Sequence, residues 1–154
     1  MSDAPIVRAG VIAPMSEEQM DRVARAEEFM LSLPQVDIRT EHLLHAGMYA
    51  RTILVPKGAV AAGALIKIAT VLIVAGEGLL TVGDHAERLS GYCVIAGSAG
   101  RKQVFLALED TYITMLFPTK AETVGQAEEE FTDDFARLMS RKEGACNRVL
   151  ITGG

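Results

Sequence analysis

Short apolar segments separated by turn-forming residues dominate the middle of this chain, from residue 36 to residue 117. Glycine, proline and acidic residues interrupt the segments, as in Pro56-Lys57-Gly58 and Gly76-Glu77-Gly78. Many of the intervening residues are β-branched, a type that favours strands. Several short strands at regular spacing predict an all-β sandwich or barrel. The segments that we predict as strands are 49–55, 64–75, 79–82, 92–96, 103–108 and 111–117.

A helix is predicted on each side of this β region. The first opens with the capping box Ser16-x-x-Gln19 and ends before Pro34. Its apolar stripe consists of Met20, Val23, Ala24, Met30 and Leu31. The second has a possible cap at Thr123-x-x-Gln126 and a stop at Gly144. Its apolar stripe consists of Ala127, Phe131, Phe135, Leu138 and Met139.

Composition excludes some classes of partner. The 154 residues suit one domain, and 15 Lys and Arg against 20 Asp and Glu give a formal charge of −5. This balance offers no basic excess for phosphates, and the chain has no Trp and only 5% aromatic residues for stacking on bases. We therefore expect no nucleic-acid partner.

One run, residues 59–76, has the length of a short membrane span, with Lys67 as its only charge. A lysine at the centre of a bilayer costs roughly 2.5–3.5 kcal/mol. The run is rich in β-branched residues and has turns on both sides, so buried strands are favoured and no membrane partner is expected. The start of the sequence lacks the basic and apolar regions of a signal peptide. Cys93 and Cys146 are interpreted as small buried residues in a reducing compartment, although a disulfide stays possible.

Few motifs point to chemistry. His42-x-x-His45 has only Glu41 nearby as a further metal ligand, so two polar residues at a strand entrance are the favoured interpretation. His85 and the Glu109-Asp110 pair are interpreted as turn residues. The glycine-rich segment 97–103 lacks the lysine and hydroxyl residues of a phosphate-binding loop, and a strand follows it.

A family resemblance adds to this pattern. Residues 45–58, HAGMYARTILVPKG, resemble a cupin-like group found in bacteriophage genomes. Its members carry a Gly-x-Tyr-Ala-Arg strand, a Pro-x-Gly turn and an apolar hairpin. Later motifs of the group match Gly100-Arg101-Lys102 and 108–111, so that the resemblance extends over residues 42–130. It implies a small jelly-roll barrel, and the predicted fold class is mainly β, with flanking N- and C-terminal helices.

The resemblance does not extend to the metal ligands of cupins. Metal-binding members carry a His-x-His pair and a Glu after the Pro-x-Gly turn, and a further His in the second motif. Here Ile66 and Ile68 stand where the imidazoles are expected, and Arg101 and Lys102 lie near the last ligand position. Aliphatic side chains cannot bind a divalent ion, so we expect no metal or other cofactor. We expect aliphatic side chains to fill the barrel interior.

The first functional hypothesis is structural and non-enzymatic: a capsid cement or decoration protein of a phage. It would be a homo-oligomer bound to the major capsid protein, on the virion surface and in the host cytoplasm before assembly. We divide the chain into an apolar N-terminal arm (1–15), one jelly-roll domain with flanking helices (16–143) and a C-terminal tail (144–154). The terminal residues expected to contact the shell are Ile6, Val7, Val11, Ile12, Val149, Leu150 and Ile151. The alternative is that both arms pack on their own barrel.

The second hypothesis is a cupin-class enzyme or small-molecule binder. Barrel-lining side chains would hold its ligand, and the candidates are His42, His45, Tyr49 and Arg51. A membrane protein built on residues 59–76 is the third.

Overall fold

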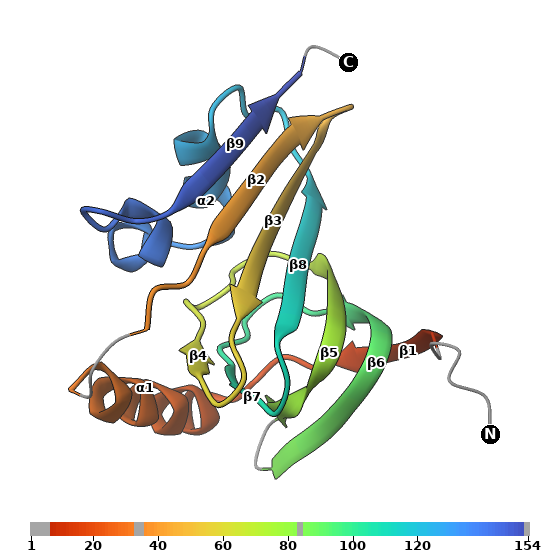
Figure 1. Cartoon of the computed structure of the whole chain (residues 1–154), viewed down its shortest axis with the longest axis vertical. Coiled ribbons are helices and arrows are strands. Elements are labelled where there is room, and N and C mark those ends of the chain that lie inside the picture. Colours follow the sequence, from red (N-terminus) through yellow and green to blue (C-terminus); the bar gives the residue numbers. More distant parts are fainter. Residues whose placement is uncertain (1–6, 33–35, 83–84, 153–154) are drawn as a thin grey trace.

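The structure, a computed structural model, describes residues 7–32, 36–82 and 85–152. Within these residues the chain forms one curled sheet of nine strands with two α-helices beside it (Figure 1). The mainly β fold class is confirmed. Seven strands follow one another across the sheet: β1 (Val7–Ile12), β6 (His85–Gly97), β5 (Thr70–Val82), β8 (Thr111–Pro118), β3 (Met48–Val55), β2 (Thr40–His45) and β9 (Asn147–Ile151).

Two short strands complete the sheet. β4 (Val60–Ala62) pairs with β7 (Val104–Ala107), and β7 also pairs with β5. Most neighbours are antiparallel, but β1 lies parallel to β6 and β9 lies parallel to β2. The core lies inside the curl of the sheet, where Tyr49, Val55, Val74 and Phe117 are fully buried.

The helix starts follow the capping motifs of the sequence. Helix α1 (Glu17–Leu31) begins after Ser16, whose Oγ accepts a hydrogen bond from the Gln19 amide at 3.1 Å, and it ends before Pro34 as predicted. Helix α2 (Val124–Phe131) begins after Thr123, whose Oγ1 accepts from the Gln126 amide at 3.2 Å. Both predicted caps are confirmed.

The second helix is shorter than its apolar stripe predicted. It ends at Phe131, and two 3-10 turns follow, at Phe135–Arg137 and Met139–Arg141. Thr132 is buried with extended backbone, and its hydroxyl accepts a hydrogen bond from the Asp134 amide at 3.1 Å. A threonine side chain that bonds to the backbone in this way competes with the helix. One continuous helix as far as Met139 is therefore wrong.

The apolar run 59–76 forms strands only at its two ends, in β4 and in the first part of β5. Residues 63–69 lie outside the strands. The amides of Ile66 and Lys67 donate to the carbonyl oxygens of Arg101, in the segment between β6 and β7, and of Phe131, at the end of α2. The prediction of a strand over residues 64–69 is thus wrong. Among the described helices, none has the length and apolar character needed to cross a membrane.

Both terminal segments are strands of the chain's own sheet. Ile12 in β1 is 3% exposed and belongs to the hydrophobic core, so the expectation that it contacts a partner is wrong. Val11 beside it is 73% exposed. In β9 the side chains of Val149, Leu150 and Ile151 are about half exposed. Val7 pairs with Tyr92 of β6, and Ile6 lies outside the described residues.

Candidate functional site

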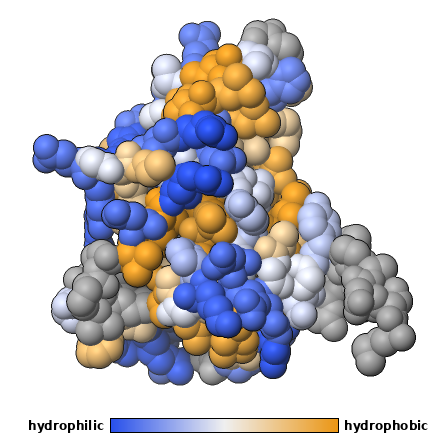
Figure 2. Space-filling view, in the orientation of Figure 1, coloured by the Kyte–Doolittle hydropathy of each residue, from blue (hydrophilic) through white to orange (hydrophobic). Residues whose placement is uncertain are grey.

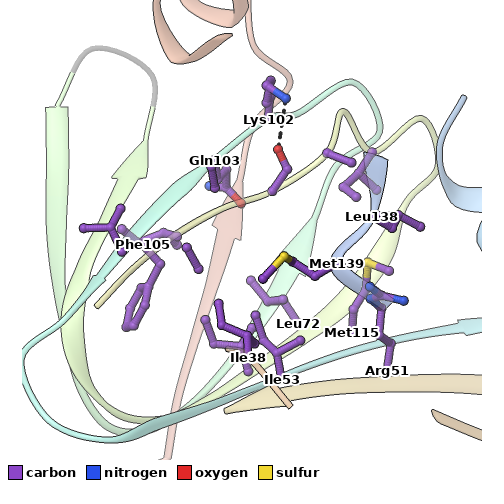
Figure 3. A pocket seen from close by; sticks show the side chains of 18 of the residues that line it. Ile38, Arg51, Ile53, Leu72, Lys102, Gln103, Phe105, Met115, Leu138 and Met139 are labelled. Carbon is purple, nitrogen blue, oxygen red and sulfur yellow. Dashed lines mark hydrogen bonds between the residues drawn. The ribbon is translucent and has the colours of Figure 1, made fainter. Parts of the chain in front are cut away.

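A cavity of about 560 Å³ lies inside the barrel formed by β3, β4, β5, β7 and β8 (Figure 3). Segments before β2, between β6 and β7 and after α2, together with Phe131 of α2, complete its wall. Most of the wall is aliphatic, and its larger apolar side chains are those of Ile38, Ile53, Ile66, Leu72, Leu80, Phe105, Ile113, Met115, Phe131, Leu138 and Met139. The expectation of a filled barrel interior is therefore wrong.

The cavity exists because one stretch of its wall consists of small residues. This stretch forms β4 and its flanks, and apart from Val60 its members are Gly58, Ala59, Ala61, Ala62, Gly63 and Ala64. Side chains of this size cannot reach the opposite strands. A volume near 560 Å³ falls within the range of about 300–1,000 Å³ found for small-molecule sites.

Arg101 is the most deeply buried cation of the wall, at 2% exposure. Its Nη1 donates a hydrogen bond to the Ser98 carbonyl oxygen at 2.9 Å, and its Nη2 donates to Thr70 Oγ1 at 2.5 Å. Burial lowers the pKa of Arg101 to about 10, so the side chain is still charged at neutral pH. Lys102, also buried, donates from Nζ to the Gly63 carbonyl oxygen at 3.0 Å (Figure 3).

Gly97, the last residue of β6, provides the space that the Arg101 guanidinium occupies. A Cβ at this position would lie 2.6 Å from Cζ of Arg101. Carbon atoms do not approach so closely, so any side chain here would displace the guanidinium. The glycine and the arginine therefore form one structural unit at this end of the cavity.

Three of the four candidate ligand residues, His42, Tyr49 and Arg51, come together beside the cavity. The His42 ring contacts Tyr49 OH through Nδ1 at 2.7 Å and Asn147 Oδ1 through Nε2 at 2.7 Å. Because an amide oxygen only accepts, Nε2 carries the proton and Nδ1 accepts from the tyrosine. Burial lowers the pKa of His42, although the hydrogen bond to Asn147 opposes this effect. A neutral His42 therefore joins β2, β3 and β9.

The third residue of this group, Arg51, forms a buried ion pair with Glu128 of α2. Its Nη1 donates to Glu128 Oε2 at 2.8 Å, and Arg141 Nε donates to Oε1 of the same carboxylate at 2.8 Å. Ser140 also donates to Oε2 of Glu128. Burial alone would raise the pKa of Glu128, but the hydrogen bonds from Ser140 and Arg141 and the charge of Arg51 outweigh it and lower this pKa.

Of the four sequence candidates, Arg51 alone also lines the large cavity. His45 lies at the far end of β2, contacts Thr152, and lines a separate hollow of about 230 Å³. Sequence reasoning missed the role of Glu128. The sequence feature that could have indicated this role is the position of Glu128 on the same helix face as Ala127 and Phe131. All three residues are buried.

The residues present do not fit a cupin metal centre. Ile66 lines the cavity and Ile68 packs against the core, so the positions expected for imidazoles hold aliphatic side chains. Within residues 7–32, 36–82 and 85–152, no three or more His, Cys, Asp or Glu side chains are grouped as metal ligands would be. Both cysteines are free in this structure, and Cys146 is exposed rather than buried as expected.

No family model and no curated protein sequence matches the chain. Among solved structures, a cupin-2 domain protein from Rhodospirillum rubrum has a TM-score of 0.47 and 14% identity, over 59% of this chain and 68% of that one. Ectoine synthase from P. lautus has a TM-score of 0.47 and 18% identity, over 64% of this chain and 76% of that one. KdgF from Halomonas sp. has a TM-score of 0.42 and 18% identity, over 51% and 75%. These are partial likenesses of shape at low sequence identity.

Proposed function

We propose that the protein binds a small, largely apolar molecule in its barrel cavity, as a binding protein rather than an enzyme. The observation that carries the proposal is the cavity itself, about 560 Å³ in volume with a mostly aliphatic wall. Transfer of apolar surface from water into such a space is favourable, at roughly 25 cal/mol per Å². An unfilled cavity lowers the stability of a domain of this size. A cavity that is kept open therefore supports a role in binding a ligand.

The polar groups beside the cavity support binding without chemistry. Two titratable side chains beside the cavity, His42 and Glu128, are held in hydrogen bonds within the protein. Their partners come from β3, β9 and the chain after α2, which indicates that this network fastens the C-terminal part to the barrel.

The test is to fill the cavity. Ala61 lines it from β4, and Ala61→Phe places a ring in the space that the ligand would occupy. The probe is N-phenyl-1-naphthylamine, a neutral apolar fluorophore whose emission rises in an apolar site. We expect the wild-type protein to bind it and Ala61→Phe to bind at least about tenfold more weakly, a loss of about 1.4 kcal/mol.

Ala50→Phe is the matched control. Ala50 lies in β3 between the inward-facing Tyr49 and Arg51, so its side chain is on the outer face of the sheet. This variant should bind the probe as the wild type does. Failure of the wild type to bind, or equal binding by Ala61→Phe, would refute the proposed function.

A second candidate, a capsid cement protein held to a phage shell through its terminal segments, is favoured by one observation. The side chains of Val149, Leu150 and Ile151 lie half exposed in β9, the last strand of the sheet. Figure 2 shows hydrophobic residues gathered where β9 and β2 lie. An edge strand with exposed apolar side chains is suited to pair with a strand of another protein.

A further inference from the structure

More basic than acidic side chains line the cavity, although the protein as a whole is acidic. The chain as a whole has a formal charge of −5. Arg51 is compensated by its buried ion pair with Glu128. Besides Arg51, the described wall contains one acidic residue, Asp134, and four basic residues, Arg101, Lys102, Arg137 and Lys142.

Arg101 stands out among these bases because its partners are neutral. Its guanidinium bonds to the carbonyl oxygen of Ser98 and the hydroxyl of Thr70, and no carboxylate of the described residues lies within ion-pair distance of it. A buried charge is costly unless an opposite charge accompanies it. The guanidinium has five N–H donors, and these bonds use two.

The position of the cations gives the cavity two distinct ends. Gly97 fixes the Arg101 guanidinium at the β6 side of the wall, and the Lys102 ammonium lies at the Gly63 carbonyl oxygen, next to β4. Figure 3 shows Lys102 at one end of the cavity, with the side chains of Ile53 and Leu72 well away from it. A ligand that matches this arrangement has an anionic head and an apolar body.

We infer that the cavity takes an apolar carboxylate, with its carboxylate at the Arg101 guanidinium and its hydrocarbon part against Leu72, Ile113 and Met115. The inference rests on the proposed function and names its ligand class. A carboxylate suits the site because it is planar, carries a single charge and can accept two parallel hydrogen bonds from a guanidinium. Its arrival would supply the negative charge that Arg101 lacks.

The experiment compares two ligands of equal chain length, decanoate and 1-decanol, as competitors that displace N-phenyl-1-naphthylamine. Hydrogen bonds to charged groups predict that decanoate binds about 10- to 100-fold more tightly than the alcohol. In Arg101→Gln this preference should be lost, with 1-decanol binding unchanged.

Three controls keep the outcome clear. Lys102→Met removes the other buried cation of the wall and should weaken decanoate selectively to a smaller extent, and it serves if Arg101→Gln does not fold. Lys67→Gln removes a lysine that does not line the cavity and pairs with Asp133, and it should leave both affinities unchanged. Unfolding curves of every variant establish that it is folded.

Equal affinity for decanoate and 1-decanol would overturn the inference and leave the proposed function standing. The inference is also overturned, with the proposed function intact, if Arg101→Gln and Lys102→Met both keep the preference for decanoate. Failure of the wild type to bind the fluorophore and both competitors would instead refute the proposed function.

Discussion

His42 and Glu128 are two buried titratable residues that connect strands and helices through hydrogen bonds. The fold lowers the pKa of both side chains. The two side chains differ in charge state. The imidazole is neutral when the protein is folded, whereas the carboxylate is ionised. Their surroundings explain the difference, because His42 lies between a hydroxyl and an amide oxygen while Glu128 lies between two guanidinium groups.

These shifts predict that the protein loses stability in acid in two stages. Below the ordinary His pKa of 6.5, the unfolded state takes up a proton that folded His42 resists, so the free energy of unfolding falls as the pH falls. Below 4.5 the unfolded state likewise protonates the carboxyl group that Glu128 keeps ionised, and stability falls further. Urea unfolding at a series of pH values measures both stages.

The variant His42→Gln isolates the first stage. It should flatten the decline between pH 7 and pH 5, whereas His85→Gln, at an exposed position, should keep it. Equal slopes in the wild type and His42→Gln would contradict the role assigned to His42.

At the scale of single residues, the sequence predicted those interactions that join residues close together in the chain. The hydrogen bonds at Ser16 and Thr123 join residues three apart, and both were recognisable as motifs. The role of Glu128 depends on Arg51, 77 positions away, and on Arg141, so no local pattern could reveal it. His42, Tyr49 and Arg51 were grouped as candidates on a resemblance, and the partners that hold them were not foreseen.

At the scale of secondary-structure elements, the strands were predicted better than the segments between them. Periodicity and turn residues located β3, β7, β8 and parts of β5 and β6. The run 64–69 has the composition of a strand but makes only an isolated bridge, between Ile66 and Arg101. The end of the second helix was also mispredicted. The hydrogen bond from the Asp134 amide to the Thr132 hydroxyl ends the helix, although the apolar stripe continues beyond it. A strand exists only where another strand offers backbone partners, which composition cannot specify.

Strand β9 gives the prediction at this scale. It is the last strand of the sheet and carries exposed apolar side chains, so we expect the protein to self-associate as its concentration rises. Leu150→Lys should favour the monomer, because a lysine at the edge opposes strand pairing. Val71→Lys is the control, since Val71 is 44% exposed but belongs to β5, which has neighbours on both sides.

Light scattering after size-exclusion chromatography measures the mass of each protein. A wild type that stays monomeric at high concentration, or a Leu150→Lys variant that associates as the wild type does, would argue against β9 as an assembly surface.

At the scale of the whole molecule, the cavity is the property that the sequence least revealed. The apolar run 59–76 indicated a filled interior, yet much of it consists of Ala and Gly, and the path of residues 63–69 leaves a space beside them. Whether small side chains leave a space depends on the distance to the opposite wall, which the fold sets. The hydrophobicity of the chain therefore serves both a core and the wall of a binding site.

The central claim is that this space holds the apolar body of a ligand. The most direct test is a methyl NMR spectrum of the protein recorded during a titration with decanoate. We predict shifts of the methyl signals of Leu72, Ile113 and Met115, which line the cavity, while those of Val149, Leu150 and Ile151 in β9 stay in place. Shifts confined to the β9 methyl groups, or no shifts at all, would contradict the account.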